Sequence, residues 1–367
     1  MSTRRVPALA DDDVSGHAMS PKKDVPIADS FEFLEADRHR GALASEIAKF
    51  LDSQHTSHPF QFAEWAGDGA YIALYRREGI LRWFAQCGAF YPAGRVLRPI
   101  RALHINRGPI CDDLEIMEVG LQRLIEGAKR EGFARIDIVP EWSGDFSESA
   151  ATMLTRNGWK TLGTTRQSLR LDLDQTLDDI FASFRKATRY EIRRSERHDL
   201  EIRMAGNDKE REDWLQLYNE MATDKKFPAD DLRHLRRILG WLGTDPARGG
   251  LLLAYNESRL LGGIVLVRSG ARCWYLLGAT AKDEKFSAGH LLQWHGLQWA
   301  KQNRCREYDF GGYREGTSSG PAFFKRGFCN NVVTFLPASR YVVSASRQRT
   351  LELITRLRRG LSSSKKS

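Results

Sequence analysis

The sequence predicts an α/β (α+β) protein of two tandem domains, each a mixed β-sheet flanked by helices. A chain of 367 residues is longer than one core of ordinary size requires, so about two domains are expected. One order of elements (hairpin, strand, helix, strand, helix, strand) also occurs twice, at an offset of about 180 residues. Units of this kind place helices on the faces of their sheets.

The first copy of this repeat begins with a hairpin. Its strands at 71–75 and 80–84 flank a turn that contains Gly79, and Asp112 or Asp113 is suited to start the first helix. The later elements are a strand at 102–106, a helix at 114–131, a strand at 135–139, a helix at 148–157 and a closing strand at 167–173.

The second copy has strands at 251–255, 260–267 and 273–278, a helix at 287–303, a strand at 307–310, a short helix at 320–326 and a closing strand at 332–335. This arrangement is similar to that of the GNAT acyltransferases. The expected domains are therefore an N-terminal GNAT-like domain at 31–176 and a C-terminal, catalytic one at 177–345. A disordered tail at 1–30 and a basic tail at 346–367 are expected to flank them.

Composition excludes several classes of protein. Hydrophobic residues make up 41% of the chain and charged residues 28%, and no apolar run approaches the roughly 18 residues of a membrane helix. The five cysteines are an odd number without a CxxC pair, which indicates neither a disulfide framework nor a zinc site. We therefore expect a cytoplasmic protein that holds no metal.

The net charge of +9 is concentrated near the C-terminus. Residues 347–366 contain seven Arg and Lys residues against one acid, Glu352, and leucines at helical spacing lie between them. Such a helix can lie on an anionic surface, here the inner face of the membrane. The alternative is a solvated helix with a Ser/Lys tail.

Arginines recur every four residues in the highly charged segment 178–199. The spacing predicts that Arg185, Arg189, Arg193 and Arg197 form one stripe on a helix. Such a row is suited to phosphates, because arginine can bind two oxygens at once. The alternative is a solvated helix that Glu191 and Glu196 partly neutralise.

Two short motifs in the second half are candidates for the chemistry. Asp309 precedes Gly311 and Gly312 at a strand end, where glycine lets a ligand approach the backbone. Phe324 and Lys325 follow on a short helix, where a lysine can stabilise an oxyanion or a phosphate. The sequence therefore places the chemistry between residues 308 and 325.

Together these segments resemble the Fem-type family, the tRNA-dependent aminoacyltransferases that add amino acids to the peptide of cell-wall precursors. The matching segments are Asn-Arg-Gly-Pro at 106–109, Lys-Ala-Thr-Arg-Tyr-Glu-Ile at 186–192, Leu-Leu-Gln-Trp at 291–294, Tyr-Asp-Phe-Gly-Gly at 308–312 and Phe-Lys-Arg-Gly-Phe at 324–328. They occur in the family's order and lie within residues 60–345.

The resemblance implies an enzyme that acts on a phosphate-bearing cell-wall precursor, with tRNA as a partner and no cofactor. It implies that Arg189 contacts the phosphates and that Lys325, beside Phe324, stabilises the transfer from the acyl ester electrostatically. Arg185, Arg193, Gly311, Gly312 and Arg107, which belongs to the Arg-Gly-Pro turn, complete the expected binding residues. Asp309 is a candidate to receive the proton of the amine.

Two departures keep other donors and functions open. The chain has no long helical hairpin of the kind that binds tRNA in wall-bridge enzymes, and Cys329 stands where the closing motif often has glycine. An acyl-CoA is the rival donor, for an N-acyltransferase acting on a polysaccharide or lipid-linked sugar, although 281–290 lacks the usual CoA-loop spacing. A non-catalytic nucleic-acid-binding protein is a third interpretation, prompted by the basic charge, but DNA is not an expected partner.

Overall fold

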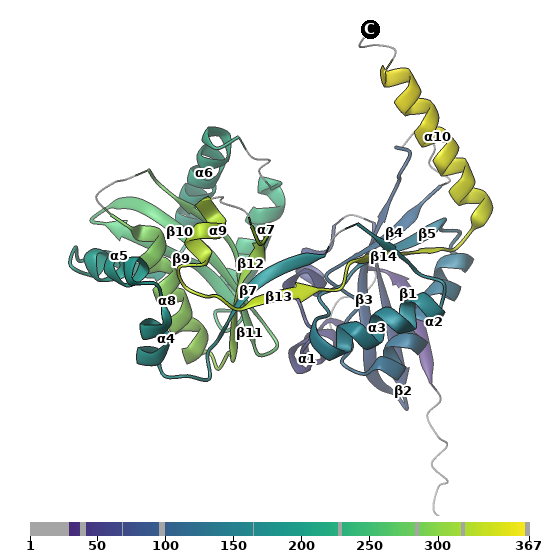
Figure 1. Cartoon of the computed structure of the whole chain (residues 1–367), viewed down its shortest axis with the longest axis horizontal. Helices are drawn as coiled ribbons and strands as arrows, with labels where there is room; N and C mark the ends of the chain where they lie inside the picture. The colour runs from purple at the N-terminus through teal and green to yellow at the C-terminus, as the bar shows by residue number, and fades with distance from the viewer. Residues whose placement is uncertain are drawn as a thin grey trace, which may run out of the picture.

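The structure, a computed structural model, contains two seven-stranded β-sheets with helices packed against them (Figure 1). It describes residues 29–36, 42–67, 69–94, 100–163, 165–226, 230–282, 286–316 and 320–363. The disordered tail predicted at 1–30 lies outside these residues, apart from Asp29 and Ser30, where the first strand begins.

The first sheet has the strand order β1-β2-β3-β4-β5-β14-β6. Only β4 and β5 are parallel among its pairs. Asp113 begins the long helix of this half as predicted, since its carboxylate accepts a hydrogen bond from the Ile116 N–H. The strands are β1 (Ser30–Glu35), β2 (Ala70–Arg77), β3 (Ile80–Phe90), β4 (Ala102–Asn106), β5 (Arg135–Val139), β6 (Lys160–Leu162) and β14 (Ala338–Val342), and the helices are α1 (Ala42–Ser53), α2 (Leu114–Arg130) and α3 (Gly144–Arg156).

The second sheet has the order β13-β7-β12-β11-β10-β9-β8, with β11 and β12 as its parallel pair. Buried side chains of α8 fill the core on one face of this sheet, and those of α6 and α7 fill the core on the other. The strands are β7 (Arg166–Asp172), β8 (Glu201–Met204), β9 (Gly249–Asn256), β10 (Arg259–Ser269), β11 (Arg272–Thr280), β12 (Glu307–Tyr313) and β13 (Val332–Phe335). The helices are α4 (Leu177–Ser183), α5 (Lys186–Glu196), α6 (Asp208–Asp224), α7 (Leu232–Thr244), α8 (Ala288–Gln302) and α9 (Gly320–Lys325).

The two sheets have the same plan, but the halves of the chain exchange one strand. β14, from the C-terminal end, pairs with β5 in the first sheet, and β7, from the first copy of the repeat, pairs with β12 in the second. The prediction that strand 167–173 closes the first half is therefore wrong. Leu169 and Leu171 of this strand are buried in the core of the second sheet. Alternating hydrophobicity shows which side chains of a strand are buried, but not which sheet it joins.

The charged segment 178–199 is two helices rather than one. α4 ends at Ser183 and α5 begins at Lys186, because Phe184 and Arg185 have extended backbone conformations. Phe184 is buried at the break, and the centre of its ring lies 5.2 Å from that of the Phe328 ring. The predicted single helix is therefore wrong, but the four arginines of the predicted stripe all follow the break, from Arg185 at the N-cap of α5 to Arg197 at its C-cap.

Polar side chains connect the two halves of the chain. The Arg248 guanidinium binds the Asp52 carboxylate at 2.6 and 2.9 Å, and the Ser57 and Ser269 hydroxyl oxygens lie 2.6 Å apart in a buried position. Figure 1 shows β7 and β13 lying between the two lobes. α10 (Ala345–Ser363) projects from the first lobe and is formed by most of the residues of the predicted basic tail. No helix in the described part of the chain is long and apolar enough to cross a membrane.

Candidate active site

The Gly311–Gly312 segment forms a bulge in β12. The pairing of β12 with β7 shifts register between Asp309 and Gly312, and Gly311 has a φ of +73°. A Cβ at Gly311 would lie 3.2 Å from the Tyr275 carbonyl oxygen and 3.7 Å from Lys325 Nζ. Glycine is required here both by the left-handed backbone conformation and by the close approach of Tyr275.

Asp309 is fully buried, and protein donors occupy its carboxylate. It accepts hydrogen bonds from the Ser168 hydroxyl, from the Gly311 N–H at 2.8 Å and from Arg170 Nε at 2.8 Å. These bonds hold the bulge against β7. Asp309 thus positions the glycine loop, and its oxygens face protein groups.

Lys325 lies on α9 with its amine anchored to the bulge. Nζ donates a hydrogen bond to the Gly312 carbonyl oxygen at 2.9 Å and lies 5.8 Å from the centre of the Tyr275 ring. Burial lowers the pKa of Lys325 to about 8, although the nearby Asp309 charge opposes this shift. The amine is therefore mostly protonated at neutral pH and provides a fixed positive charge.

Two pockets adjoin the residues that Lys325 contacts, although Lys325 itself is not among the lining residues of either. The cleft pocket, of about 590 Å³, lies between the halves of the chain, and the second-domain pocket, of about 810 Å³, is lined by β10, β11, α8 and α9. Tyr275 and Pro321 line both. Gly311 and Gly312 line the cleft pocket, whereas Phe324 lines the second-domain pocket with its ring 4.9 Å from that of His290. Both volumes lie in the range of about 300–1,000 Å³ that is typical of small-molecule sites.

Glu141 is a buried carboxylate of the cleft pocket that the sequence analysis missed. Arg107, predicted to bind substrate, donates to Glu141 Oε1 together with Arg166 Nη1, which lies at 2.9 Å. Oε2 has no hydrogen-bond partner. Burial raises the pKa of Glu141 to about 7, because it outweighs the opposing effect of Arg107.

His58 lies beside this carboxylate but is held neutral. Its Nε2 is 4.0 Å from Glu141 Oε1, and burial together with the charges of Arg107, Arg272 and Arg170 places the pKa of His58 well below its usual value. A sequence signal for Glu141 did exist. It follows β5, which is parallel to β4, and the carboxyl ends of parallel strands meet at one edge of a sheet.

The predicted arginine stripe is engaged with the protein itself. Arg189 Nη1 donates to the Ala182 carbonyl oxygen at 2.7 Å and to that of Phe184, so it satisfies the end of α4. The guanidinium groups of Arg185 and Arg193 lie 4.7 Å and 5.2 Å from the ring centres of Phe323 and Phe181, respectively. None of these arginines lines the cleft pocket or the second-domain pocket. Their binding to phosphate stays a prediction.

No group of three or more His, Cys, Asp or Glu side chains among the described residues is arranged to hold a metal ion. The five cysteines are free and buried.

Comparison with known proteins identifies the class of enzyme. Residues 182–326 match a protein family that is described as an acetyltransferase (GNAT) domain. The UDP-N-acetylmuramoylpentapeptide-lysine N(6)-alanyltransferase of Weissella viridescens is 22% identical over 242 residues, covering 61% of this chain and 70% of that protein.

Two solved structures share the fold. A crystal structure of FemX has a TM-score of 0.75 and 18% identity, covering 88% of this chain and 99% of that one. The structure of L-PGS from Bacillus licheniformis has a TM-score of 0.55 and 12% identity, with 85% and 95% covered. These likenesses confirm the predicted tandem GNAT-like fold. The chain is an acyltransferase with a GNAT domain, and it resembles the Fem-type aminoacyltransferases in sequence as well as in fold.

Proposed function

We propose that the protein transfers an aminoacyl group from aminoacyl-tRNA to the amine of a phosphate-bearing peptidoglycan precursor in the cytoplasm. The observation that carries this proposal is the position of Lys325, whose amine is fixed on the carbonyl oxygen of Gly312, a lining residue of the cleft pocket, and lies near Tyr275, which lines both pockets. Aminolysis of an ester requires two substrates held together and positive charge where the oxyanion develops. Lys325 provides that charge.

The proposed reaction needs a proton acceptor but no nucleophilic residue. The acceptor amine attacks the ester carbonyl, the new C–N bond replaces the C–O bond to the ribose, the amine loses a proton and the ribose oxygen gains one. Glu141 takes the proton, since it lines the cleft pocket, has an unpartnered Oε2 and has a pKa of about 7. Asp309 positions the bulge, because three protein donors occupy its oxygens.

The charge of the cleft pocket supports a phosphate-bearing acceptor. Arg107, Arg166 and Arg314 line it, against Glu141 as its single carboxylate among the lining residues described. The Nε atoms of Arg107 and Arg166 are buried without a hydrogen-bond partner. The name of the Weissella viridescens relative gives UDP-N-acetylmuramoylpentapeptide as the molecule that it modifies, a diphosphate compound of the class that these arginines would attract.

An acyl-CoA donor is the second candidate, for an N-acyltransferase acting on a polysaccharide or lipid-linked sugar. The acetyltransferase description matches the second half of the chain, and the second-domain pocket reaches Gly289 in the first turn of α8. Free N–H groups at the start of a helix bind pyrophosphate well. This pocket could therefore receive either a CoA thioester or the aminoacyl end of a tRNA.

One assay separates the two donors. The purified protein is incubated with UDP-N-acetylmuramoylpentapeptide and either charged tRNA or acetyl-CoA, while deacylation of the tRNA and release of the thiol are followed. We expect acceptor-dependent deacylation of the tRNA and a product heavier by one aminoacyl group. Thiol release without deacylation would replace the proposal by its CoA-dependent alternative.

We also propose that α10 brings the enzyme to an anionic membrane surface. Leu353 and Leu357 lie one helical turn apart and are 58% and 59% exposed, while the exposed residues Arg349 and Arg356 occupy neighbouring helical positions. We expect co-sedimentation with phosphatidylglycerol vesicles that 0.5 M salt and Leu353→Glu both reduce several-fold. Equal retention by pure phosphatidylcholine vesicles would contradict an electrostatic contact.

A further inference from the structure

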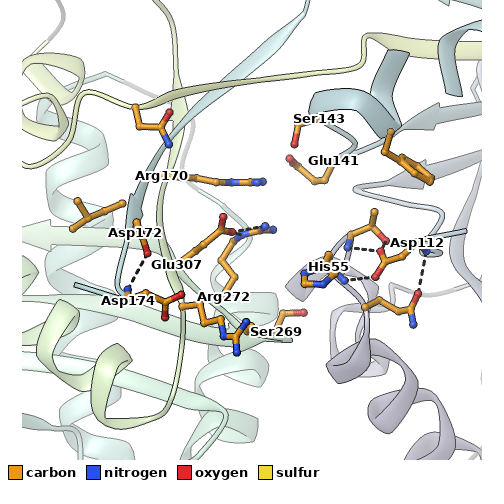
Figure 2. A pocket seen from close by; sticks show the side chains of 17 residues that line it. His55, Asp112, Glu141, Ser143, Arg170, Asp172, Asp174, Ser269, Arg272 and Glu307 are labelled. Atoms are coloured by element: carbon orange, nitrogen blue, oxygen red, sulfur yellow. Dashed lines mark hydrogen bonds and ion pairs between the residues drawn. The ribbon is translucent and has the colours of Figure 1, made fainter. Parts of the chain in front are cut away.

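A third pocket, of about 580 Å³, lies between the two halves, outside the candidate active site (Figure 2). We call it the arginine-floored pocket. Of its lining residues, it shares only Glu141 with the cleft pocket. It opens at the end of β7 and at the beginnings of β11 and β12, facing the 54–56 loop and Asp112 of the first half. Of its lining residues, the proposed transfer reaction uses only Glu141.

The inner part of this pocket contains two guanidinium groups with few partners. Arg170 is 6% exposed, its Nε binds Asp309 at 2.8 Å, and its Nη2 has no hydrogen-bond partner. Figure 2 shows the Arg170 side chain directed toward the wall that Glu141 and Ser143 form. A buried charged donor without an acceptor is destabilising, so an oxygen anion reaching this end of the pocket would be bound favourably.

Arg272 adds a second cation beside the first. Both guanidinium groups lie against the Trp274 ring, at 5.8 Å for Arg170 and 5.3 Å for Arg272. Burial and then the charge of Arg170 lower the pKa of Arg272, although it binds Glu307 at 2.6 Å. The two cations therefore repel each other in a poorly hydrated place, and a carboxylate shared between them would relieve that repulsion.

The mouth of the pocket carries carboxylates, beside the exposed Arg306. Asp172 and Asp174 are exposed on one side, and the Asp174 N–H donates a hydrogen bond to the Asp172 carboxylate at 2.9 Å. Asp112 lies on the other side, but its carboxylate already binds the N–H groups of His55 at 2.6 Å and Thr56 at 2.9 Å. Asp172 and Asp174 thus remain available to an ammonium group, and they disfavour polyanions such as nucleotides.

We propose that the arginine-floored pocket binds a zwitterion of the amino-acid or short-peptide class. The carboxylate of the ligand lies at Arg170 and Arg272, and its ammonium group lies at Asp172 and Asp174. The volume of about 580 Å³ suits a molecule of this size. Apart from Glu141, the lining residues of this site belong to neither the cleft pocket nor the second-domain pocket, so the site can be tested without any assay of acyl transfer.

The test is calorimetric titration of the full chain with alanyl-alanine. We expect saturable binding that falls about tenfold or more when the dipeptide is N-acetylated or C-amidated, because each change removes one of the two ionic contacts. Arg272→Gln should weaken binding about tenfold, and Asp172→Asn with Asp174→Asn should remove the preference for a free amine. Arg130→Gln, a change at an exposed arginine of α2, is the matched control and should bind like the wild type.

Three results would overturn the proposal. They are the absence of saturable binding at millimolar dipeptide, equal binding of the blocked and free dipeptides, and unchanged affinity in the Arg272→Gln variant. Inorganic pyrophosphate is titrated in parallel, and tighter binding of pyrophosphate than of the dipeptide would show a general anion site instead. Thermal unfolding of each variant confirms that loss of binding is not loss of fold.

Discussion

The two sheets contain the same acid–arginine pair at equivalent positions, yet only one pair is followed by a bulge that binds a lysine. In the first sheet Asp137 on β5 faces Arg340 on β14, which donates two hydrogen bonds to it at 2.6 and 2.9 Å. In the second sheet Asp309 on β12 faces Arg170 on β7. The exchanged strands thus supply the arginine in both halves.

What differs is the sequence after the acid. Asp137 is followed by Ile138 and Val139, and β5 pairs with β14 without a register shift. Phe310, Gly311 and Gly312 follow the second acid instead, and there the pairing of β12 with β7 bulges and the Gly312 carbonyl oxygen binds Lys325. Because both sheets contain the acid–arginine pair, the pair is explained by the fold. The chemistry is therefore better assigned to the bulge and to Lys325 than to Asp309.

Removing the second acid should give the largest loss of stability. Asp309→Asn leaves Arg170 without its anionic partner in a fully buried position, and we expect a loss of about 3–5 kcal/mol in the free energy of unfolding. Asp137→Asn should cost less, about 1–3 kcal/mol, since the Arg340 side chain is 27% exposed and can be hydrated. Denaturant unfolding of both variants measures the difference. Equal losses would show that burial does not distinguish the two pairs.

Removing the lysine should affect turnover and leave stability nearly unchanged. Lys325→Ala takes away the charge beside residues that line the two pockets, and we expect a decrease in kcat of about 10²–10³-fold. The free energy of unfolding should change by about 1 kcal/mol or less, since the side chain is half-buried. Arg326→Ala on the adjacent position is the control. A Lys325→Ala enzyme with wild-type turnover would remove this residue from the mechanism.

A side chain added at Gly311, in the bulge, should have a smaller effect on stability and on turnover. Gly311→Ala forces a side chain into a φ of +73° and to 3.2 Å from the Tyr275 carbonyl oxygen, so we expect about 1–3 kcal/mol of destabilisation. Displacement of the Lys325 anchor should also lower kcat about tenfold. Val139→Ala, at the equivalent position of the first sheet, should leave kcat unchanged. Equal decreases in kcat for the two variants would show that the end of β12 has no role in the reaction that the end of β5 lacks.

The sequence predicts the repeat well because its signals are local. Hairpins, helix starts such as Asp113 and alternating strands depend on neighbouring residues, and most of the expected elements are present. The exchange of β7 and β14 could not be predicted in this way. Their patterns show a buried and an exposed face, but the choice of sheet depends on contacts with residues far away in the chain.

The candidate site was predictable only where its residues are close in sequence. Gly311, Gly312 and Lys325 lie within 15 residues, and the structure brings them together. Glu141 and His58 come from separate loops and neither belongs to a motif, although the position of Glu141 after β5 was a signal that could have been used. The single helix predicted at 178–199 is divided at Phe184, but the predicted arginines all lie on α5 or at its ends. What spacing along the sequence could not show is that Arg185, Arg189 and Arg193 contact groups of the protein itself.

The pH profile is the most sensitive test of the roles given to Glu141 and Lys325. The pKa of Glu141 is raised to about 7, so its proton-accepting form appears as the pH rises through 7. The pKa of Lys325 is lowered to about 8, so its charge is lost as the pH rises through 8. We therefore expect kcat to rise toward pH 7, to be highest between about 7 and 8, and to fall beyond that, each limb changing by severalfold.

Two variants assign the limbs of this profile to their residues. Glu141→Gln should lower kcat and flatten the rising limb, because the amide cannot take a proton. Lys325→Arg should keep part of the activity and lose the falling limb, since a guanidinium stays charged at pH 9. If the falling limb persisted in Lys325→Arg, the group that titrates near pH 8 would be another one, such as the substrate amine. In that case Lys325 would position the bulge, as Asp309 does. Its charge would then not explain why the chemistry is assigned to the second sheet.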